Sequence, residues 1–175
     1  MADVNRQIAG ARSRAMGEIF ERWITSACNY YQREGYAVIE KTPEPTKILG
    51  KPDRFGRFKA CYTKQAQPDF KGALCDGSCI IFDAKHTDKD KIRQEVVTET
   101  QWETFDKYEA MNARCYVVVS LGMTEFYRVP WKDWKRMKEL FGHKYMSYME
   151  LEQYRVPDRS QTIMFLEGVE VRNEN

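Results

Sequence analysis

Two carboxylates and a lysine stand at a spacing that suits phosphate chemistry. Pro68-Asp69 is followed, fourteen residues after the aspartate, by Asp83-Ala84-Lys85 at the end of an apolar run. Aspartate oxygens hold a hard cation such as Mg²⁺ against an anionic phosphodiester, and a lysine amine can stand beside the attacking water. The pattern therefore predicts a metal-dependent nuclease site in which Lys85 supplies the amine.

The local sequence indicates how these residues would meet. Side chains alternate faces along a strand, so Asp83 and Lys85 would point to the same side of a strand over residues 78–84. Residues 71–77 supply turn chemistry, and such a hairpin would bring Asp69 close to Asp83. The short motif alone is weak, because Asp69 could instead cap a turn while Asp83 and Lys85 mark a solvated strand end.

An amphipathic helix is expected over residues 16–31. Apolar residues recur there three or four apart, which is typical of a helix with one buried stripe. Glu18 and Glu21 lie on that helix, and Glu21 on the flank of the stripe would add a third carboxylate to the metal site. In the plainer interpretation, both glutamates are solvated helix residues.

Composition bounds the class of protein. At 175 residues and 42% hydrophobic content, we expect a single domain over residues 1–175 with a sizeable core. No apolar run approaches the roughly 18 residues of a membrane span, and the polar N-terminus has no signal-peptide pattern, so we expect a soluble cytoplasmic protein. Five cysteines without a disulfide rhythm are typical of reduced thiols. Cys75, Cys79 and His86 offer zinc only a loose ligand set.

Positive charge gathers in one segment, although the net charge is only +2. Residues 41–64 hold seven basic and two acidic residues, and their prolines and glycines break any long helix, so residues 46–64 indicate a projecting hairpin. Its aromatic residues would stack on unpaired bases or pack against a partner subunit, unless it is an ordinary solvated loop. The residues expected to contact DNA phosphates here are Lys47, Lys51, Arg54, Arg57, Lys59 and Lys64.

A second basic cluster precedes the first expected helix. Arg12 and Arg14 lie within residues 1–14, which we expect to form a flexible basic arm. Such arms are often disordered until they meet nucleic acid, so both arginines are further candidates for DNA contact.

The rest of the chain indicates an α/β scaffold. Strands are expected over residues 36–39, 114–120, 126–129 and 162–166, and helices over residues 94–111 and 131–141. The order of strand, hairpin, helix and strand fits a small α/β nuclease with a mixed central sheet flanked by helices.

Taken together, these blocks resemble the RecU family of Holliday junction resolvases, within the PD-(D/E)xK nuclease superfamily with its restriction-endonuclease-like core. The likeness runs from about Gly17 to Val129, and the order of the blocks is more specific than any one motif. The chain resembles a divergent or phage-type member. The blocks that carry the resemblance are residues 36–45, the basic segment, residues 68–72, residues 81–87, Gln101 and residues 117–120.

The resemblance implies a homodimer that binds four-way DNA junctions and nicks two opposing strands symmetrically, in recombination and repair, with Mg²⁺ or Mn²⁺. A strand-exchange recombinase is a further implied partner, and the hairpin over residues 46–64 would be a stalk that enters the junction centre. The implied site consists of Asp69, Asp83, the Ala84 carbonyl and Glu21 as metal ligands, Lys85 as the residue that orients or activates water, and Gln101 beside them. Hydrolysis would leave a 5′-phosphate.

The chain also departs from the family pattern, and other functions stay open. Asp83 stands in place of a glutamate, which withdraws the carboxylate by one methylene, and Gln67-Pro68 replace hydroxyl residues. One alternative is a non-cleaving accessory protein that binds junctions or modulates a recombinase. The other is a different branched-DNA or restriction-type nuclease. A non-cleaving accessory protein would show no metal-dependent cleavage. Another type of nuclease would prefer duplex sequences or branched ends over four-way junctions.

Overall fold

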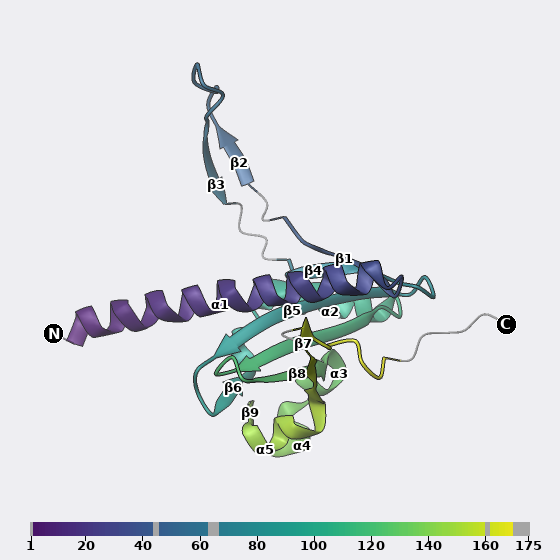
Figure 1. The fold of residues 1–175 in the computed structure, drawn as a ribbon. Coiled ribbons are helices and arrows are strands. Elements are labelled where there is room, and N and C mark those ends of the chain that lie inside the picture. The colour runs from purple at the N-terminus through teal and green to yellow at the C-terminus, as the bar shows by residue number, and fades with distance from the viewer. Residues whose placement is uncertain (1, 44–45, 63–66, 160–161, 170–175) are drawn as a thin grey trace.

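A computed structural model describes residues 2–43, 46–62, 67–159 and 162–169, with helices packed on both faces of a sheet (Figure 1). The helices are α1 (Ala2–Arg33), α2 (Glu99–Ala110), α3 (Trp131–Lys135), α4 (Met137–Phe141) and α5 (Tyr148–Leu151). The main sheet contains β1 (Ala37–Lys41), β4 (Phe70–Leu74), β5 (Cys79–Thr87), β7 (Arg114–Leu121), β8 (Glu125–Pro130) and β10 (Arg155–Val156). Two-stranded sheets pair β2 (Thr46–Leu49) with β3 (Lys59–Tyr62), β6 (Lys91–Arg93) with β9 (Tyr145–Ser147), and β11 (Asp158–Arg159) with β12 (Thr162–Ile163).

The main sheet is mixed. Its strand order is β1, β4, β5, β7, β8 and β10, in which β5 and β7 run parallel and every other pair is antiparallel. The parallel pair is joined by a crossover that contains α2, as parallel strands require. The expected α/β fold, with a mixed central sheet and flanking helices, is therefore confirmed.

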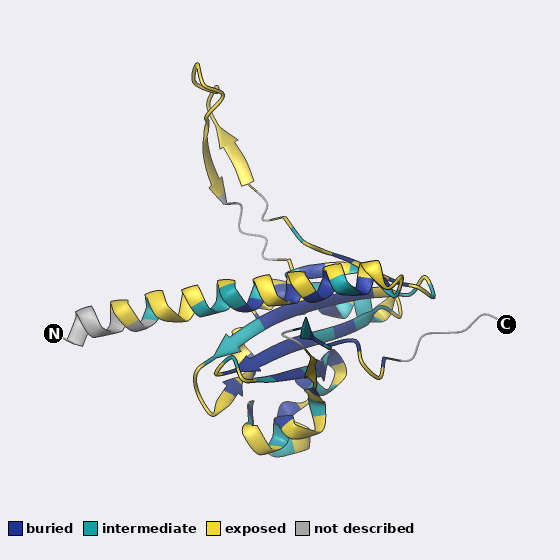
Figure 2. Cartoon of the chain, in the orientation of Figure 1, coloured by how far each residue is buried: buried dark blue, intermediate teal, exposed yellow. Residues whose placement is uncertain are grey.

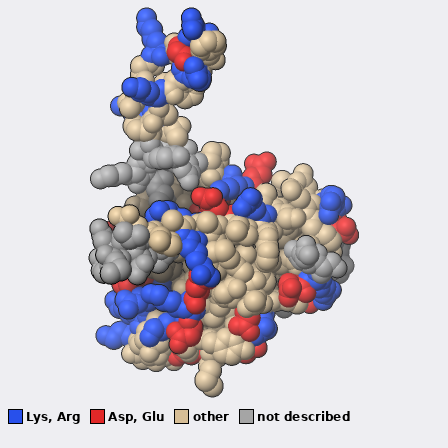
Figure 3. Space-filling model, turned by 60° about the vertical axis from the view of Figure 1, so that its left-hand side comes forward, with Lys and Arg blue, Asp and Glu red and all other residues tan. Residues whose placement is uncertain are grey.

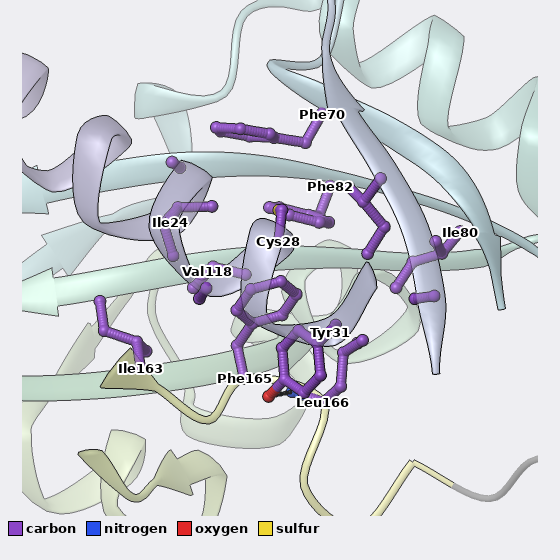
Figure 4. Packing of buried hydrophobic residues seen from close by; sticks show 14 of the residues in the cluster. Ile24, Cys28, Tyr31, Phe70, Ile80, Phe82, Val118, Ile163, Phe165 and Leu166 are labelled. Carbon is purple, nitrogen blue, oxygen red and sulfur yellow. Dashed lines mark hydrogen bonds between the residues drawn. The ribbon is translucent and has the colours of Figure 1, made fainter. Parts of the chain in front are cut away.

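Two hydrophobic clusters lie on opposite faces of this sheet. On one face Ile24 and Tyr31 of α1 pack over Phe82 of β5, together with Phe165 from the C-terminal segment (Figure 4). The other face is filled from α2 and α3, where the ring of Phe105 stacks on Trp131. Burial follows the central strands, while residues 46–61 of the β2–β3 hairpin are exposed (Figure 2).

α1 is longer than the apolar pattern indicated. It begins at Ala2 rather than near Met16, so residues 2–14 are helical and do not form a separate arm before the helix. The stripe begins late because only the later part of α1 lies over the sheet, and the earlier part extends past the sheet edge (Figure 1). That part is rich in alanine and arginine, which favour helix without burial. No helix among the described residues, α1 included, is long and apolar enough to cross a membrane.

Two helices expected to be continuous are interrupted by polar side chains. Residues 94–96 form a 3₁₀ turn, and α2 starts only after Thr98, which caps it. The helix expected over residues 131–141 breaks at Arg136 into α3 and α4. Gln94 Nε2 donates to the carbonyl oxygens of Trp134 and Lys135, at 2.7 and 3.1 Å, and so satisfies the end of α3.

The strand and turn boundaries of the hairpin that carries Asp69 and Asp83 also differ from those expected from the sequence. Residues 71–74, expected to turn, belong to β4, and the turn is confined to residues 75–78. Gly77 there has a φ of 74°, and Asp76 Oδ1 accepts the Ser78 N–H at 2.9 Å. Within β4, Gly72 lies against β1, where a Cβ would stand 2.0 Å from the Val38 carbonyl oxygen. Only glycine allows so close an approach of two strands.

Replacing Gly72 with alanine should therefore push β1 away from β4. We expect Gly72→Ala to lower the free energy of unfolding by about 2–3 kcal/mol in urea denaturation, because a backbone carbonyl cannot rotate aside. The control is Gly17→Ala within α1, where an added Cβ meets nothing within 4 Å. That change should raise the stability by about 0.5–1 kcal/mol. Equal effects of the two changes would contradict the close approach of the strands.

Candidate active site

The register of β4 and β5 sets Asp69 against Asp83. Phe70 pairs with Phe82, so the residue just before β4 faces Asp83 across the hairpin. The Asp69 N–H donates to Asp83 Oδ1 at 3.2 Å, and the Ala84 N–H donates to Asp69 Oδ2 at 3.0 Å. The two aspartates thus meet as expected, although Asp69 precedes a strand instead of ending one.

Asp83 is fully buried and held from several sides. Its Oδ1 accepts a hydrogen bond from Gln101 Nε2 at 2.9 Å in addition to the Asp69 N–H. Its Oδ2 forms an ion pair with Lys85 Nζ, and no other described group donates to that oxygen. A buried carboxylate is costly unless it is paired. Asp83 therefore depends on a cation at Oδ2, and Lys85 supplies one in the structure.

The pKa values of Asp69 and Lys85 are both raised at this site. Burial, reinforced by the Asp83 carboxylate, raises the pKa of Asp69 to about 7, and the Lys85 ammonium only partly offsets this. Burial acts to lower the pKa of Lys85, but the carboxylates of Asp83, Asp69 and Glu21 outweigh it, so that the pKa is raised. Lys85 is therefore an ammonium at neutral pH, and Asp69 gains or loses its proton near neutrality.

Gln101 is fixed by its own helix cap. Its Oε1 accepts hydrogen bonds from the Thr98 N–H at 3.1 Å and the Thr98 hydroxyl at 3.2 Å, which leaves its NH₂ group to face Asp83. The Thr98 Oγ1 in turn accepts the Gln101 N–H at 3.4 Å, completing a capping box. Sequence reasoning missed Thr98, although the T-x-x-Q spacing was a readable signal. The first turn of α2, whose dipole favours an anion, thus lies against Asp83.

Glu21 reaches the rim of the site. Its Oε2 lies 2.5 Å from Lys41 Nζ at the end of β1. The negative charge of Glu21 also contributes to the raised pKa of Lys85. Together with Glu18, Arg22 and Thr25 it lines a depression of about 330 Å³. Glu21 is thus on the side of α1 nearest the acidic pair. Lys41, counted in the basic segment, is a neighbour of the site that the sequence did not single out.

The donor set suits a divalent cation. Asp69 and Asp83 offer oxygens, and Asp83 Oδ2 is a buried acceptor that, among the described residues, is met only by the Lys85 ammonium. Those residues contain no group of three or more His, Cys, Asp or Glu side chains close enough to share an ion. Mg²⁺ is commonly held by one or two carboxylates and several waters, so two aspartates and the Ala84 carbonyl fit it. The loose zinc set does not assemble, because His86 contacts Ser120 and Asp88.

The basic residues expected to contact DNA lie away from the acidic pair. Lysine and arginine side chains gather at the outer end of the β2–β3 hairpin (Figure 3). Arg12 and Arg14 are exposed on the overhanging part of α1, and Arg12 Nε lies 3.8 Å from Asp88 Oδ2 beyond the end of β5. Lys64 lies outside the described residues. The exposed hairpin residues are Lys47, Lys51, Arg54, Arg57 and Lys59.

The tip of the hairpin is ordered by its own contacts. Asp53 Oδ1 accepts the N–H groups of Phe55 and Arg57 at 2.8 and 3.0 Å, and its Oδ2 pairs with Arg57 Nε at 3.1 Å. These hydrogen bonds to the carboxylate lower the pKa of Asp53. The guanidinium groups of Arg54 and Arg57 lie over the Phe55 ring, 4.8 and 5.0 Å from its centroid. An exposed aromatic ring thus contacts two cations at the far end of the hairpin.

The raised pKa of Asp69 has a consequence for stability. The unfolded chain holds fewer protons than the folded chain between about pH 4 and pH 7, so stability falls as pH rises across that window. We expect Asp69→Asn, without metal, to be more stable than the wild type at pH 8, on the order of 2 kcal/mol, with the difference shrinking toward pH 4. Thermal unfolding at the two pH values measures this. Asp90→Asn, at an exposed site, is the control and should change little.

Comparisons with known proteins identify the family of this chain. Residues 15–171 match the model of the family RecU, described as Recombination protein U. The chain is 30% identical over 122 residues to the Holliday junction resolvase RecU of Streptococcus oralis, covering 67% of this chain and 62% of that protein. It therefore spans less than two thirds of the length of this relative.

A more distant likeness is found among solved structures. The Archaeoglobus fulgidus protein Hjc, a Holliday junction resolvase, shares 13% identity with a TM-score of 0.42, over 67% of this chain and 74% of that chain. A likeness of that extent adds nothing to the assignment, which rests on the family match. Because that match covers well over half of its residues, the chain belongs to the RecU family.

Proposed function

We propose that this protein is a metal-dependent endonuclease that resolves four-way DNA junctions. One observation carries the proposal, namely the buried Asp69 and Asp83 pair with the Lys85 ammonium in contact, in a chain of the RecU family. The relative from Streptococcus oralis is named a Holliday junction resolvase, which favours the same substrate here. A phosphodiester in a four-way junction is the bond on which this site would act.

The site residues have distinct parts in this chemistry. When bound, Mg²⁺, or Mn²⁺ in its place, would supply Lewis-acid polarisation of the scissile phosphate and stabilisation of the leaving oxygen. Asp69, Asp83 and the Ala84 carbonyl would hold it, and Asp69 must release its proton to do so. The Lys85 ammonium, released from Asp83 Oδ2, orients the attacking water and stabilises developing negative charge. The product would carry a 5′-phosphate.

Two further side chains support this chemistry from a distance. Gln101 holds Asp83 Oδ1, so that Oδ2 is the oxygen left for the cation. Glu21 contributes through a water rather than as a direct ligand, because its carboxylate is paired with Lys41. Mg²⁺ usually keeps several waters, and a carboxylate on the rim can accept their hydrogen bonds.

The hairpin gives the site its preference for a branched substrate. The β2–β3 hairpin projects away from the sheet (Figure 1). It carries exposed arginines and lysines, and the Phe55 ring is in contact with two guanidinium groups. Cations contact phosphates, and exposed rings stack on bases that are unpaired at a branch point. The exposed Ile48 and Leu49 would be covered by the DNA or by the second subunit.

A homodimer is part of the proposal. A junction presents two equivalent strands, and a two-fold pair of subunits would bring one active site to each. Symmetric nicking follows from that arrangement. A strand-exchange recombinase, which family likeness suggests as a partner, would dock on a surface outside the site.

Cleavage of a labelled four-way junction and a matched linear duplex tests the proposal. With Mg²⁺ we expect paired nicks in the junction alone, lost with EDTA and reduced at least about 10³-fold in Asp83→Ala, because the cation loses its buried ligand. Junction binding by Asp83→Ala should be equal or tighter, since an anion is removed from a DNA site. Tight binding without cleavage in Mg²⁺ or Mn²⁺ would instead make the protein a junction-binding accessory, and preferred cutting of duplex would favour a restriction-type nuclease.

The hairpin is tested separately by charge removal. Changing Lys47, Lys51, Arg54 and Lys59 to alanine should weaken junction binding and reduce the slope of log K against log salt by up to about 3–4, because fewer counterions are released. The matched control changes Lys132, Lys138 and Lys144, exposed lysines on and after α3 and α4, and should leave binding within about twofold. Unchanged discrimination between junction and duplex in the hairpin variant would contradict the stalk role.

A further inference from the structure

A groove of about 310 Å³ adjoins the acidic pair on the same face of the sheet. Its floor consists of Lys71 of β4 and Ile81 of β5, which pair directly across the two strands. Lys71 lies two residues after Asp69, and Ile81 lies two residues before Asp83, so all four side chains share one face. Two residues of strand span about 7 Å. The groove therefore begins about one nucleotide away from the place where a scissile phosphate would lie.

The groove is open because α2 covers only part of this face. α2 packs over β5 and β7 and leaves the outer strands uncovered, so Val38 and Glu40 of β1 are exposed while Ala37 and Ile39 are buried beneath α1. The wall of the groove is one side of α2, with residues at helical spacing. These are Thr100, Glu103, Thr104, Lys107 and Tyr108. Thr42 and Pro68 line the groove near the acidic pair.

Several polar groups in the groove lack a full set of partners. Lys71 is exposed and makes no ion pair with any residue that the structure describes. The Thr42 hydroxyl oxygen is enclosed and finds no hydrogen-bond partner within the same residues. Glu103 and Lys107 are loosely paired at 3.7 Å, and both are largely exposed. The groove thus presents a free ammonium, hydroxyls and a carboxylate beside the half-buried Tyr108.

We infer that this groove is the subsite for the nucleotide next to the scissile phosphate, an inference that rests on the proposed function. A DNA strand held at the acidic pair would continue along β4, where this face of the sheet is uncovered, as the exposed Val38 and Glu40 of the neighbouring strand β1 show. The Lys71 ammonium would bind the neighbouring phosphate, and the groove has room for one sugar and base. Glu103 is placed to accept a hydrogen bond from the amino group of a base, which would make the groove select among nucleotides.

Single-turnover cleavage of junctions that differ in the base pairs flanking the nick tests this inference. Lys71→Ala should lower the rate constant at least about tenfold on every junction, as expected for a lost contact to a charged group. Glu103→Gln should change the nucleotide preference at one position beside the nick and leave other positions unchanged. The control for Lys71→Ala is Lys138→Ala on α4, which should stay within about twofold of the wild type.

A filled groove provides a second measurement. Thr100→Trp adds bulk at an exposed helix position and should reduce cleavage more than about 100-fold while Mn²⁺ binding and the melting temperature stay near wild type. Ala110→Trp, at the exposed end of the same helix and outside the groove, should cleave normally. Wild-type rates and preferences in Lys71→Ala, Glu103→Gln and Thr100→Trp would overturn the subsite while leaving the nuclease intact. A wild-type protein that cuts no junction would instead overturn the proposed function.

Discussion

The pairing of β4 with β5 is the constraint on which this structure depends. It sets Asp69 against Asp83 at a depth where two carboxylates cannot both stay charged without a nearby cation. Lys85 partly meets that need from two residues along the same strand. The close approach of β1 at Gly72 fixes β4 from its other side. The fold thus holds an unfavourable pair of charges in place, and a divalent cation would relieve it.

The remaining elements act on this pair in turn. The parallel strand β7 pairs with β5, with Val117 opposite Asp83. The crossover between these strands places the capped first turn of α2 against Asp83. α1 lies on the other face but carries Glu21 round to the rim. Since α2 stops short of β1, the same crossover that fixes Asp83 also leaves the groove beside it open. In the proposed function, one helix would therefore both position Asp83 and leave room for the substrate.

The sequence predicted those features that depend on local pattern. These features are the aspartate and lysine motif, the alternation of Asp83 and Lys85, the apolar strand at Val117 to Val119, and the projecting hairpin. Each depends on residues that are close together in the sequence. The start of α1 was missed because the apolar stripe marks contact with the sheet and not the ends of a helix. The close packing at Gly72, the pairing of Glu21 with Lys41, and the groove at Lys71 arise from strands far apart in sequence. No spacing rule encodes such contacts.

Calorimetric titration of the protein with Mn²⁺ at pH 6.5, in two buffers of different ionisation enthalpy, tests the central claim most directly. The pKa of about 7 leaves Asp69 mostly protonated at that pH, so a cation bound by the acidic pair must release most of one proton, and this release should fall close to zero at pH 8.5. Asp83→Asn should bind Mn²⁺ at least tenfold more weakly. Binding without proton release, or unaltered binding in Asp83→Asn, would contradict the assignment of the buried pair as the metal site.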